Sequence, residues 1–208
     1  SSGGHTNAVL KNPLVYQPFD PGEVGKKIEL TFGPLSGGNH AKSIIEDAGY
    51  VCSDSEKASI AQFIKGHFAD RRKGITDEEL LQGYFVFRSP IKFSSIDYGK
   101  TSNRSSVTCE GELFGKQGGH ERTHEGKDSA LAALVGMVRE FQPDFDIQSH
   151  RSSSKGEGFN ALSVSWIVVT DGVTTVEGIG EDQDIELSAM RAFIDAINKH
   201  HIEKNYRK

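Results

Sequence analysis

Residues 91–199 run through the same short plan twice, and this doubling is the strongest constraint on how the chain can fold. Each copy has two strand-like stretches followed by a helix-like one. The first copy reads SVTCEGELFG, HERTHEG and DSALAALVGMVREF, and the second reads ALSVSWIVVTDG, VTTVEGIG and DIELSAMRAFIDAIN. One such unit alone would leave a sheet face and a helix face exposed to water, whereas two units, or four in a dimer, close a common core. The repeat predicts a small doubled α+β module, of a kind that binds a ligand at its seam or joins subunits more often than it catalyses a reaction.

The hydrophobic spacing within each copy supports this plan. The strand-like stretches place Val, Ile, Thr and Trp166 in near-alternation, which is typical of a half-exposed antiparallel sheet. The helix-like stretches repeat apolar residues along one face. These are Leu131, Leu134, Val135, Val138 and Phe141 in the first copy and Met190, Phe193, Ile194 and Ile197 in the second. The serine-rich run at 152–158 interrupts the pattern, and we expect it to be a polar connection.

Composition argues against nucleic acid or a membrane as a partner. The 208 residues carry a formal net charge of −5, and the last ten hold four Lys or Arg against one Glu, so the rest of the chain is more acidic still. An acidic body repels phosphate backbones and anionic lipids. No stretch approaches the roughly 20 apolar residues of a membrane span, and no hydrophobic signal segment opens the sequence. Cys52 and Cys109 cannot form a disulfide framework, so we expect two reduced thiols in a cytoplasmic protein.

A region with helical signals precedes the repeat. The stretch GPLSGGNHAKSIIEDAGY reads as a Gly-rich turn that leads into a helix. Ser53 with Glu56, and Thr76 with Glu79, match the Ser/Thr-x-x-Glu capping box that marks a helix start. These signals predict a small helical subdomain that ends near Phe87, after an extended opening segment without a sustained period.

One motif is misleading. His120 to His124 spell H-E-R-T-H, which matches the zinc-protease pattern H-E-x-x-H. That pattern binds zinc only on a helix, where residues i and i+4 share one face. Here it lies between glycines, has no apolar helical face and corresponds in the repeat to a strand. On a strand the two imidazoles would be about 13 Å apart, at roughly 3.3 Å per residue. We therefore predict no metal site at this motif.

Four stretches, in order along the chain, resemble the C-terminal half of 2-isopropylmalate synthase and its relatives, the homocitrate and citramalate synthases. They are GGHTNAVLKNP, VYQPFDPGEVG, SGGNHAKSIIEDAGY and GIGEDQDIELSAMRAFIDAIN. In this family a metal-dependent barrel condenses acetyl-CoA with a 2-oxo acid. Two small subdomains follow, and then a regulatory domain of two βββα units that dimerises and binds the end-product amino acid.

The resemblance implies a remnant of the first linker subdomain at 1–34, a helical second subdomain at 35–87 and a regulatory domain at 88–208. The expected fold class is α+β: two βββα units forming a dimeric regulatory domain, preceded by a small helical linker subdomain and an extended N-terminal segment. The family's barrel, with its divalent metal, would lie before residue 1. We therefore expect a part cut from an acyl-CoA-dependent C-acyltransferase, with no cofactor of its own and no activity alone.

The resemblance assigns two residues to catalysis. His5 in GGHTNAVLK and Tyr16 in VYQPFDP match positions that the family places over the active site of the partner subunit. An imidazole and a phenol can each donate or accept a proton near the methyl group of acetyl-CoA or its developing enolate. The alternative is that both side chains only pack or cap the opening loop.

The resemblance also implies an effector site. Its members are Gly126, Asp128, Ser129, Ala130, Leu131, Gly178, Gly180, Asp184, Ile185 and Ser188. Gly turns permit close approach, N–H groups at a helix N-terminus hold a carboxylate, and a small residue such as Ala130 leaves room for a branched side chain. Asp128 and Ser129 replace the family's Gly and Pro, which puts the backbone approach in the first copy in doubt. The same residues can also be plain caps and turns.

These observations lead to one hypothesis with open alternatives. The chain is expected to be the homodimeric regulatory part of a 2-isopropylmalate synthase, binding L-leucine for feedback inhibition of leucine biosynthesis. A dimerisation module without an effector is the first alternative. The second is the same region of a homocitrate or citramalate synthase, with lysine or isoleucine as effector.

Overall fold

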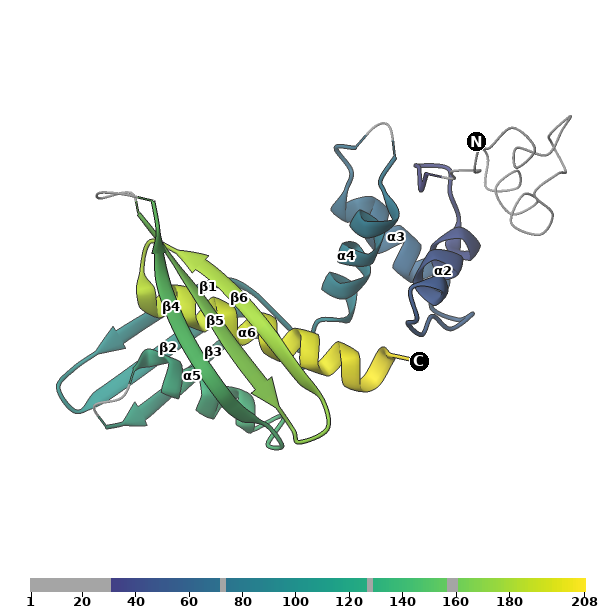
Figure 1. Cartoon of the computed structure of the whole chain (residues 1–208). Helices are drawn as coiled ribbons and strands as arrows, with labels where there is room; N and C mark the ends of the chain where they lie inside the picture. The colour runs from purple at the N-terminus through teal and green to yellow at the C-terminus, as the bar shows by residue number, and fades with distance from the viewer. Residues whose placement is uncertain (1–30, 72–73, 127–128, 157–160) are drawn as a thin grey trace, which may run out of the picture. The chain divides into compact units, whose positions relative to one another are not determined.

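The computed structural model describes residues 31–71, 74–126, 129–156 and 161–208, which form two compact units (Figure 1). The first unit extends to Arg88 and also contains Tyr206–Lys208. The second unit comprises Ser89–Asn205. None of the helices in these ranges is long and apolar enough to span a membrane.

The first unit is helical, as its sequence predicts. It contains α2 (Gly38–Asp47), α3 (Lys57–His67) and α4 (Asp77–Arg88). The capping box predicted for α4 is confirmed, because the Thr76 amide donates to Glu79 Oε2 (3.0 Å) and the Glu79 amide donates to Thr76 Oγ1 (3.2 Å). The core between the helices contains fully buried side chains from all three, among them Ile45, Ile60, Ile64, Leu80 and Tyr84.

The capping box predicted for α3 is wrong. Glu56 is itself the N-cap residue of α3, and no side chain caps the helix. Its carboxylate instead accepts hydrogen bonds from the Arg88 guanidinium (2.8 and 3.1 Å) and from Ser53 Oγ (2.6 Å). These bonds hold the pKa of Glu56 at about 2. The partner that takes Glu56 away from its helix lies 32 positions further along the chain, so the local motif could not reveal it.

The second unit has two three-stranded antiparallel sheets. The first sheet contains β1 (Ile91–Lys100), β2 (Arg104–Leu113) and β3 (Lys116–Glu125) in the order β1-β2-β3, and α5 (Ala130–Arg139) follows it. The second contains β4 (Asp146–Lys155), β5 (Leu162–Thr170) and β6 (Thr175–Asp182) in the order β4-β5-β6, followed by α6 (Ile185–Tyr206). Each sheet has a register shift near the start of its first strand, between Phe93 and Ser95 and between Ile147 and Ser149. The predicted α+β class with two βββα units is confirmed.

One hydrophobic core serves both copies. Cys109 of β2, Leu134 of α5, Ile167 of β5 and Phe193 of α6 all belong to it, and each is completely buried. Burial raises the pKa of the Cys109 thiol to about 12, so this cysteine is a neutral core residue. The apolar face predicted for α6 is fully buried at Met190, Phe193 and Ile197.

The polar connection expected at 152–158 is wrong for its first part. Ser152 to Lys155 belong to β4, an edge strand whose residues in this stretch are exposed. Backbone pairing with β5 holds this strand, and Ser152 Oγ also lies 2.8 Å from Ser165 Oγ. An edge strand needs no apolar side chains to pair, which is why its serines read as a loop.

Candidate functional site

The N-terminus of α6 is capped by one of the predicted site residues. Asp184 Oδ1 accepts hydrogen bonds from the amides of Glu186 (2.7 Å) and Leu187 (3.2 Å). Asp184 Oδ2 accepts one from the Tyr98 hydroxyl of β1 (2.7 Å). The bond with Tyr98 is the main reason that the pKa of Asp184 is lowered, and it raises the pKa of Tyr98 to about 12. The carboxylate is therefore ionised and fully engaged within the protein.

The N-terminus of α5 is capped from the other copy of the repeat. The Ala130 amide donates to Glu186 Oε2 (3.1 Å), and Lys100 Nζ donates to Glu186 Oε1 (2.7 Å). Ser129 is the N-cap residue but makes no side-chain cap hydrogen bond. Glu186 thus connects the first turns of both helices. Sequence reasoning missed this residue, because an acid in a first helical turn signals only favourable interaction with its own helix dipole.

Three predicted residues lie in the contact between α6 and its sheet. A Cβ atom on Gly178 would lie 2.1 Å from the Ala192 carbonyl oxygen, and one on Gly180 would lie 2.2 Å from the Ser188 carbonyl oxygen. Ser188 is completely buried, and its hydroxyl lies 2.7 Å from Ser165 Oγ. The two glycines therefore allow the helix backbone to lie directly on β6. Here the close approach that glycine permits is used by the protein's own helix.

A cavity of about 380 Å³ lies beside α5. Two of the predicted residues, Ser129 and Leu131, line it. The rest of its lining combines small and branched apolar groups with two basic side chains, namely Ala132, Val135, Gly136, Ile147, His124 and Arg139. Its volume lies within the range of small-molecule pockets, its wall is mainly apolar with a few polar groups, and it is open to solvent on one side.

The remaining predicted residues are elsewhere or outside the described ranges. Gly126 has a positive φ of 141°, and its amide donates to the Asn103 carbonyl (2.8 Å), which closes a loop. Ile185 is 60% exposed at the start of α6 and does not line the cavity. His5, Tyr16 and Asp128 lie outside the described residues. The structure therefore groups Ser129, Ala130 and Leu131 near Asp184 and Glu186, and separates them from Gly178, Gly180 and Ser188.

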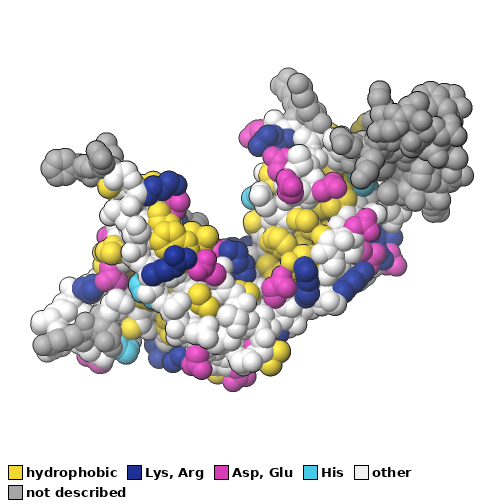
Figure 2. Space-filling view, in the orientation of Figure 1, with side chains coloured by type: hydrophobic (Ala, Val, Ile, Leu, Met, Phe, Trp, Pro, Cys, Tyr) yellow, Lys and Arg dark blue, Asp and Glu magenta, His cyan; other side chains and the backbone are white. Residues whose placement is uncertain are grey.

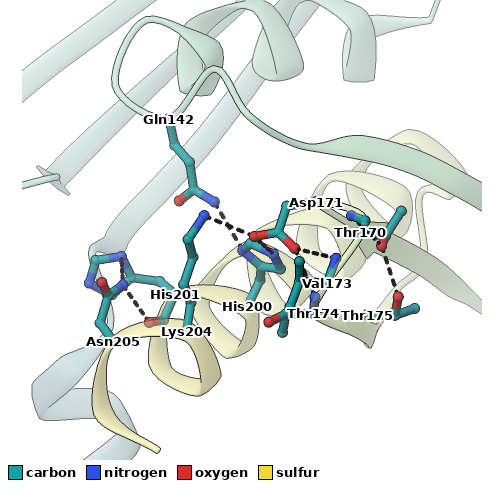
Figure 3. Close-up of polar contacts among 11 residues, drawn as sticks. Gln142, Thr170, Asp171, Val173, Thr174, Thr175, His200, His201, Lys204 and Asn205 are labelled. Carbon is teal, nitrogen blue, oxygen red and sulfur yellow. Dashed lines mark hydrogen bonds and ion pairs between the residues drawn. The ribbon is translucent and has the colours of Figure 1, made fainter.

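A second polar cluster lies near the C-terminal end of α6 (Figure 3). Asp171 accepts hydrogen bonds from Lys204 Nζ (2.8 Å) and from the amides of Val173 (3.0 Å) and Thr174 (2.8 Å), which lower its pKa. The imidazole of His200 is completely buried, with Nε2 at 3.4 Å from Asp171 Oδ2 and Nδ1 at 3.1 Å from the Gln142 amide nitrogen. These contacts tie the β5–β6 turn to α6. Among the described residues, His200 Nε2 has no hydrogen-bond partner. The other polar groups of the cluster bond to one another, so we assign the cluster a structural role.

The H-E-R-T-H motif lies on β3, as its place in the repeat predicts. Its two histidines pair across to different residues of β2, His120 with Cys109 and His124 with Ser105. In the part of the chain that the structure describes, no three His, Cys, Asp or Glu side chains gather closely enough to bind a metal ion.

The fold and the doubled arrangement of helix N-termini define a class of small two-copy βββα domains. A family model described as the LeuA allosteric (dimerisation) domain matches residues 78–201, and a second, described as homocitrate synthase post-HMGL domain-like, matches residues 1–73. Since the first match covers more than half of the 208 residues, the chain belongs to the LeuA allosteric (dimerisation) domain family.

Curated relatives agree with this assignment. The 2-isopropylmalate synthase of Geobacillus stearothermophilus is 28% identical over 204 residues, which cover 95% of this chain and 39% of the relative. The enzyme of the same name from Lysinibacillus sphaericus is 28% identical over 218 residues, covering 99% of this chain and 42% of the relative. The 2-isopropylmalate synthase of Photorhabdus laumondii is 28% identical over 206 residues, which cover 95% of this chain and 39% of the relative. The chain spans about two fifths of the length of these relatives.

Proposed function

We propose that the chain is the regulatory part of a 2-isopropylmalate synthase, and that it forms a homodimer and binds L-leucine for feedback inhibition. The observation that carries this proposal is the cavity beside α5. It lies in the matched regulatory domain, and Ser129 and Leu131, which the family resemblance assigns to the effector, line it.

The chemistry of the cavity suits a branched-chain amino acid. Ala132, Val135 and Ile147 supply an apolar wall for an isobutyl group. Arg139 offers a cation for the ligand's carboxylate, and Asp146, which does not line the cavity but lies 3.9 Å from Arg139, offers an anion for its ammonium group. At this separation the two side chains are only loosely paired, and both are at least half exposed. A zwitterionic ligand can therefore pair with both Arg139 and Asp146 at a small cost in free energy.

The helix N-termini do not hold the ligand carboxylate in this proposal. The first amide of α5 already donates to Glu186, and the first amides of α6 donate to Asp184. Leucine would instead bind along the side of α5. Its feedback effect follows from linkage, because a ligand that prefers one arrangement of the dimer shifts the population toward it.

The parent protein is proposed to be a cytoplasmic acyl-CoA-dependent C-acyltransferase that condenses acetyl-CoA with 2-oxoisovalerate. In it, residues 1–34 and 35–87 would be the two linker subdomains and 88–208 the regulatory domain. His5 and Tyr16 would assist the barrel of the partner subunit, where the divalent metal also acts. We expect the 208 residues alone to have no condensing activity, because the resemblance assigns the chemistry to the barrel.

An effector-free dimerisation module is the second candidate. The packing of Gly178 and Gly180 against α6, and the contact of Ser188 of α6 with Ser165, favour it, since these residues then have a complete role without a ligand. A homocitrate or citramalate synthase as parent would change the ligand to lysine or isoleucine.

Thermal melting of the chain with L-leucine, L-isoleucine or L-lysine separates these candidates. A ligand at 100 times its dissociation constant adds about 2.7 kcal/mol of stability, which is on the order of 5–10 °C in a domain of this size. We expect a leucine-selective rise that R139Q abolishes and R104Q, a matched change at an exposed arginine of β2, leaves intact. A flat response to all three amino acids would leave the dimerisation module as the function.

A further inference from the structure

The outer faces of the two sheets differ in chemistry. The outer face of the β1-β2-β3 sheet carries polar side chains, among them Asp97, Ser106, Thr108, Glu110 and Thr123. On β5, Ile167 and Val169 face the core, so the alternate residues lie on the outer face of the β4-β5-β6 sheet. That face carries an apolar stripe formed by the partly exposed Leu162, Trp166 and Val168 of β5 and the exposed Ile179 of β6, while Val164 between them in β5 is already buried in the single chain. Figure 2 shows hydrophobic side chains gathered over this sheet beside basic and acidic ones.

Two rows of opposite charge flank the apolar stripe. Arg151 and Lys155 lie on β4, and Glu177 and Glu181 lie on β6. The Arg151 guanidinium lies 4.5 Å from the centre of the Trp166 ring and 3.1 Å from the Glu177 carboxylate, and Lys155 Nζ lies 3.2 Å from Glu181. The four charged side chains are 42–67% exposed. Exposed pairs of this kind contribute little to the stability of one chain, so they can exchange partners at little cost.

We propose that a second copy of the chain stacks on this outer face, which we call the β5 face, with β5 over β5 and the two-fold axis along the strands. This orientation places β4 of each copy over β6 of the other. Arg151 and Lys155 then meet the partner's Glu177 and the partner's Glu181, while the apolar stripes pack at the roughly 10 Å spacing of stacked sheets. The inference rests on the proposed homodimer and assigns it a surface.

The arrangement of charges identifies the occupant as another copy. An isologous interface must be complementary to itself, which requires each charge to have its opposite across the two-fold axis. The β5 face meets this condition with two cations on one edge and two anions on the other. A two-fold axis across the strands would instead place like charges together, so the charge pattern also selects the orientation.

Charge reversal on the full 208-residue chain tests the surface. R151E/K155E makes both edges acidic and E177K/E181K makes both basic, so each variant repels itself. We expect the dimer dissociation constant of each to rise by at least about tenfold, because like charges placed together in an interface are strongly unfavourable. An equimolar mixture restores opposite charges at both edges, and we expect it to dimerise like the parent chain in sedimentation equilibrium. E121K/E125K, with the same spacing on exposed positions of β3, is the matched control and should dimerise normally.

Cross-linking gives a second readout that does not depend on the charge variants folding. V168C lies on the proposed axis and should cross-link to its own copy with a short bis-maleimide, whereas T108C on the polar face of the first sheet should not. The native cysteines, Cys52 and Cys109, are both buried. A dimer that survives both charge reversals, or that V168C does not cross-link, overturns the β5 face and leaves the homodimer standing. A parent chain that stays monomeric overturns both.

Discussion

The N-termini of α5 and α6 depend on the hydrogen bond between Tyr98 and Asp184. The Tyr98 hydroxyl holds Asp184 in place while that carboxylate caps α6, and Glu186, two residues on, caps α5. A local sequence pattern indicates the cap at Asp184, since an acid before an apolar-periodic run is a common helix start. It does not indicate Tyr98, which lies 86 positions away.

Replacing Tyr98 with Phe tests this contact through its pH dependence. We expect Y98F to lower the free energy of unfolding by about 1.5–3 kcal/mol at neutral pH, because one hydrogen bond to a charged group is lost. The pKa of Asp184 is lowered in the folded state, so its contribution is present above about pH 4 and is lost as the pH falls. The pKa of Tyr98 is raised, so its contribution is present below about pH 10 and is lost as the pH rises through about 12.

Urea unfolding of wild type and Y98F between about pH 3 and pH 11 measures how the contribution of this hydrogen bond changes with pH. The stability difference between wild type and Y98F should be widest near neutral pH and should narrow in acid, where Asp184 becomes protonated. A difference that stays constant across the range would mean that Tyr98 stabilises the fold by packing alone.

At the scale of elements, the two copies of the repeat differ in how their helices lie on their sheets. In the second copy, Gly178 and Gly180 let α6 contact β6 backbone to backbone. In the first, the corresponding strand β3 presents larger side chains, and Arg122 lies 3.5 Å from where a Cβ on Gly136 of α5 would be. The cavity beside α5 occurs in the copy where side chains separate the helix from the sheet.

Adding a methyl group where α6 contacts β6 should therefore lower the free energy of unfolding. In G178A the new Cβ would lie 2.1 Å from the Ala192 carbonyl oxygen and 2.3 Å from the Ala196 nitrogen, so α6 must shift. We expect a loss of about 3 kcal/mol or more, since overpacking against backbone cannot be relieved by a side-chain rotation. Denaturant unfolding measures it. G66A, on α3 with no atom near its added Cβ, should be neutral or stabilising by up to about 1 kcal/mol, and equal effects at both sites would contradict the packing argument.

At the scale of the whole molecule, the core shared by the two βββα copies lies entirely within the second unit, from Ile91 to Ile197. A unit with its own core can fold by itself. We expect residues 89–205, produced alone, to melt cooperatively, as followed by circular dichroism. A broad, non-cooperative transition would mean that this core depends on residues of the helical unit.

Hydrophobic periodicity predicted the fold well because each strand and helix of a repeat must bury one face. That requirement sets the spacing of apolar residues within each short stretch. The doubled α+β plan, the strand at 120–124 and the buried face of α6 all followed from it. Periodicity did not predict the strand at Ser152 to Lys155. An edge strand is held by backbone hydrogen bonds and does not require alternating apolar side chains. For the site, the sequence indicated Ser129 and Leu131, which line the cavity, but it could not separate them from Gly178, Gly180 and Ser188.

The sequence by itself determined a doubled plan of strands followed by a helix, and its resemblance to a known family supplied the βββα architecture, because both depend on patterns within short stretches and on their order. Only the tertiary structure decided what the key residues contact. It placed Glu186 on the amide of Ala130, 56 positions away, and the backbone of α6 on two glycines of β6. It also separated a polar outer sheet face from an apolar one. Such pairings arise when distant segments pack together, so the physical cause lies in the packed core and has no local signature in the chain.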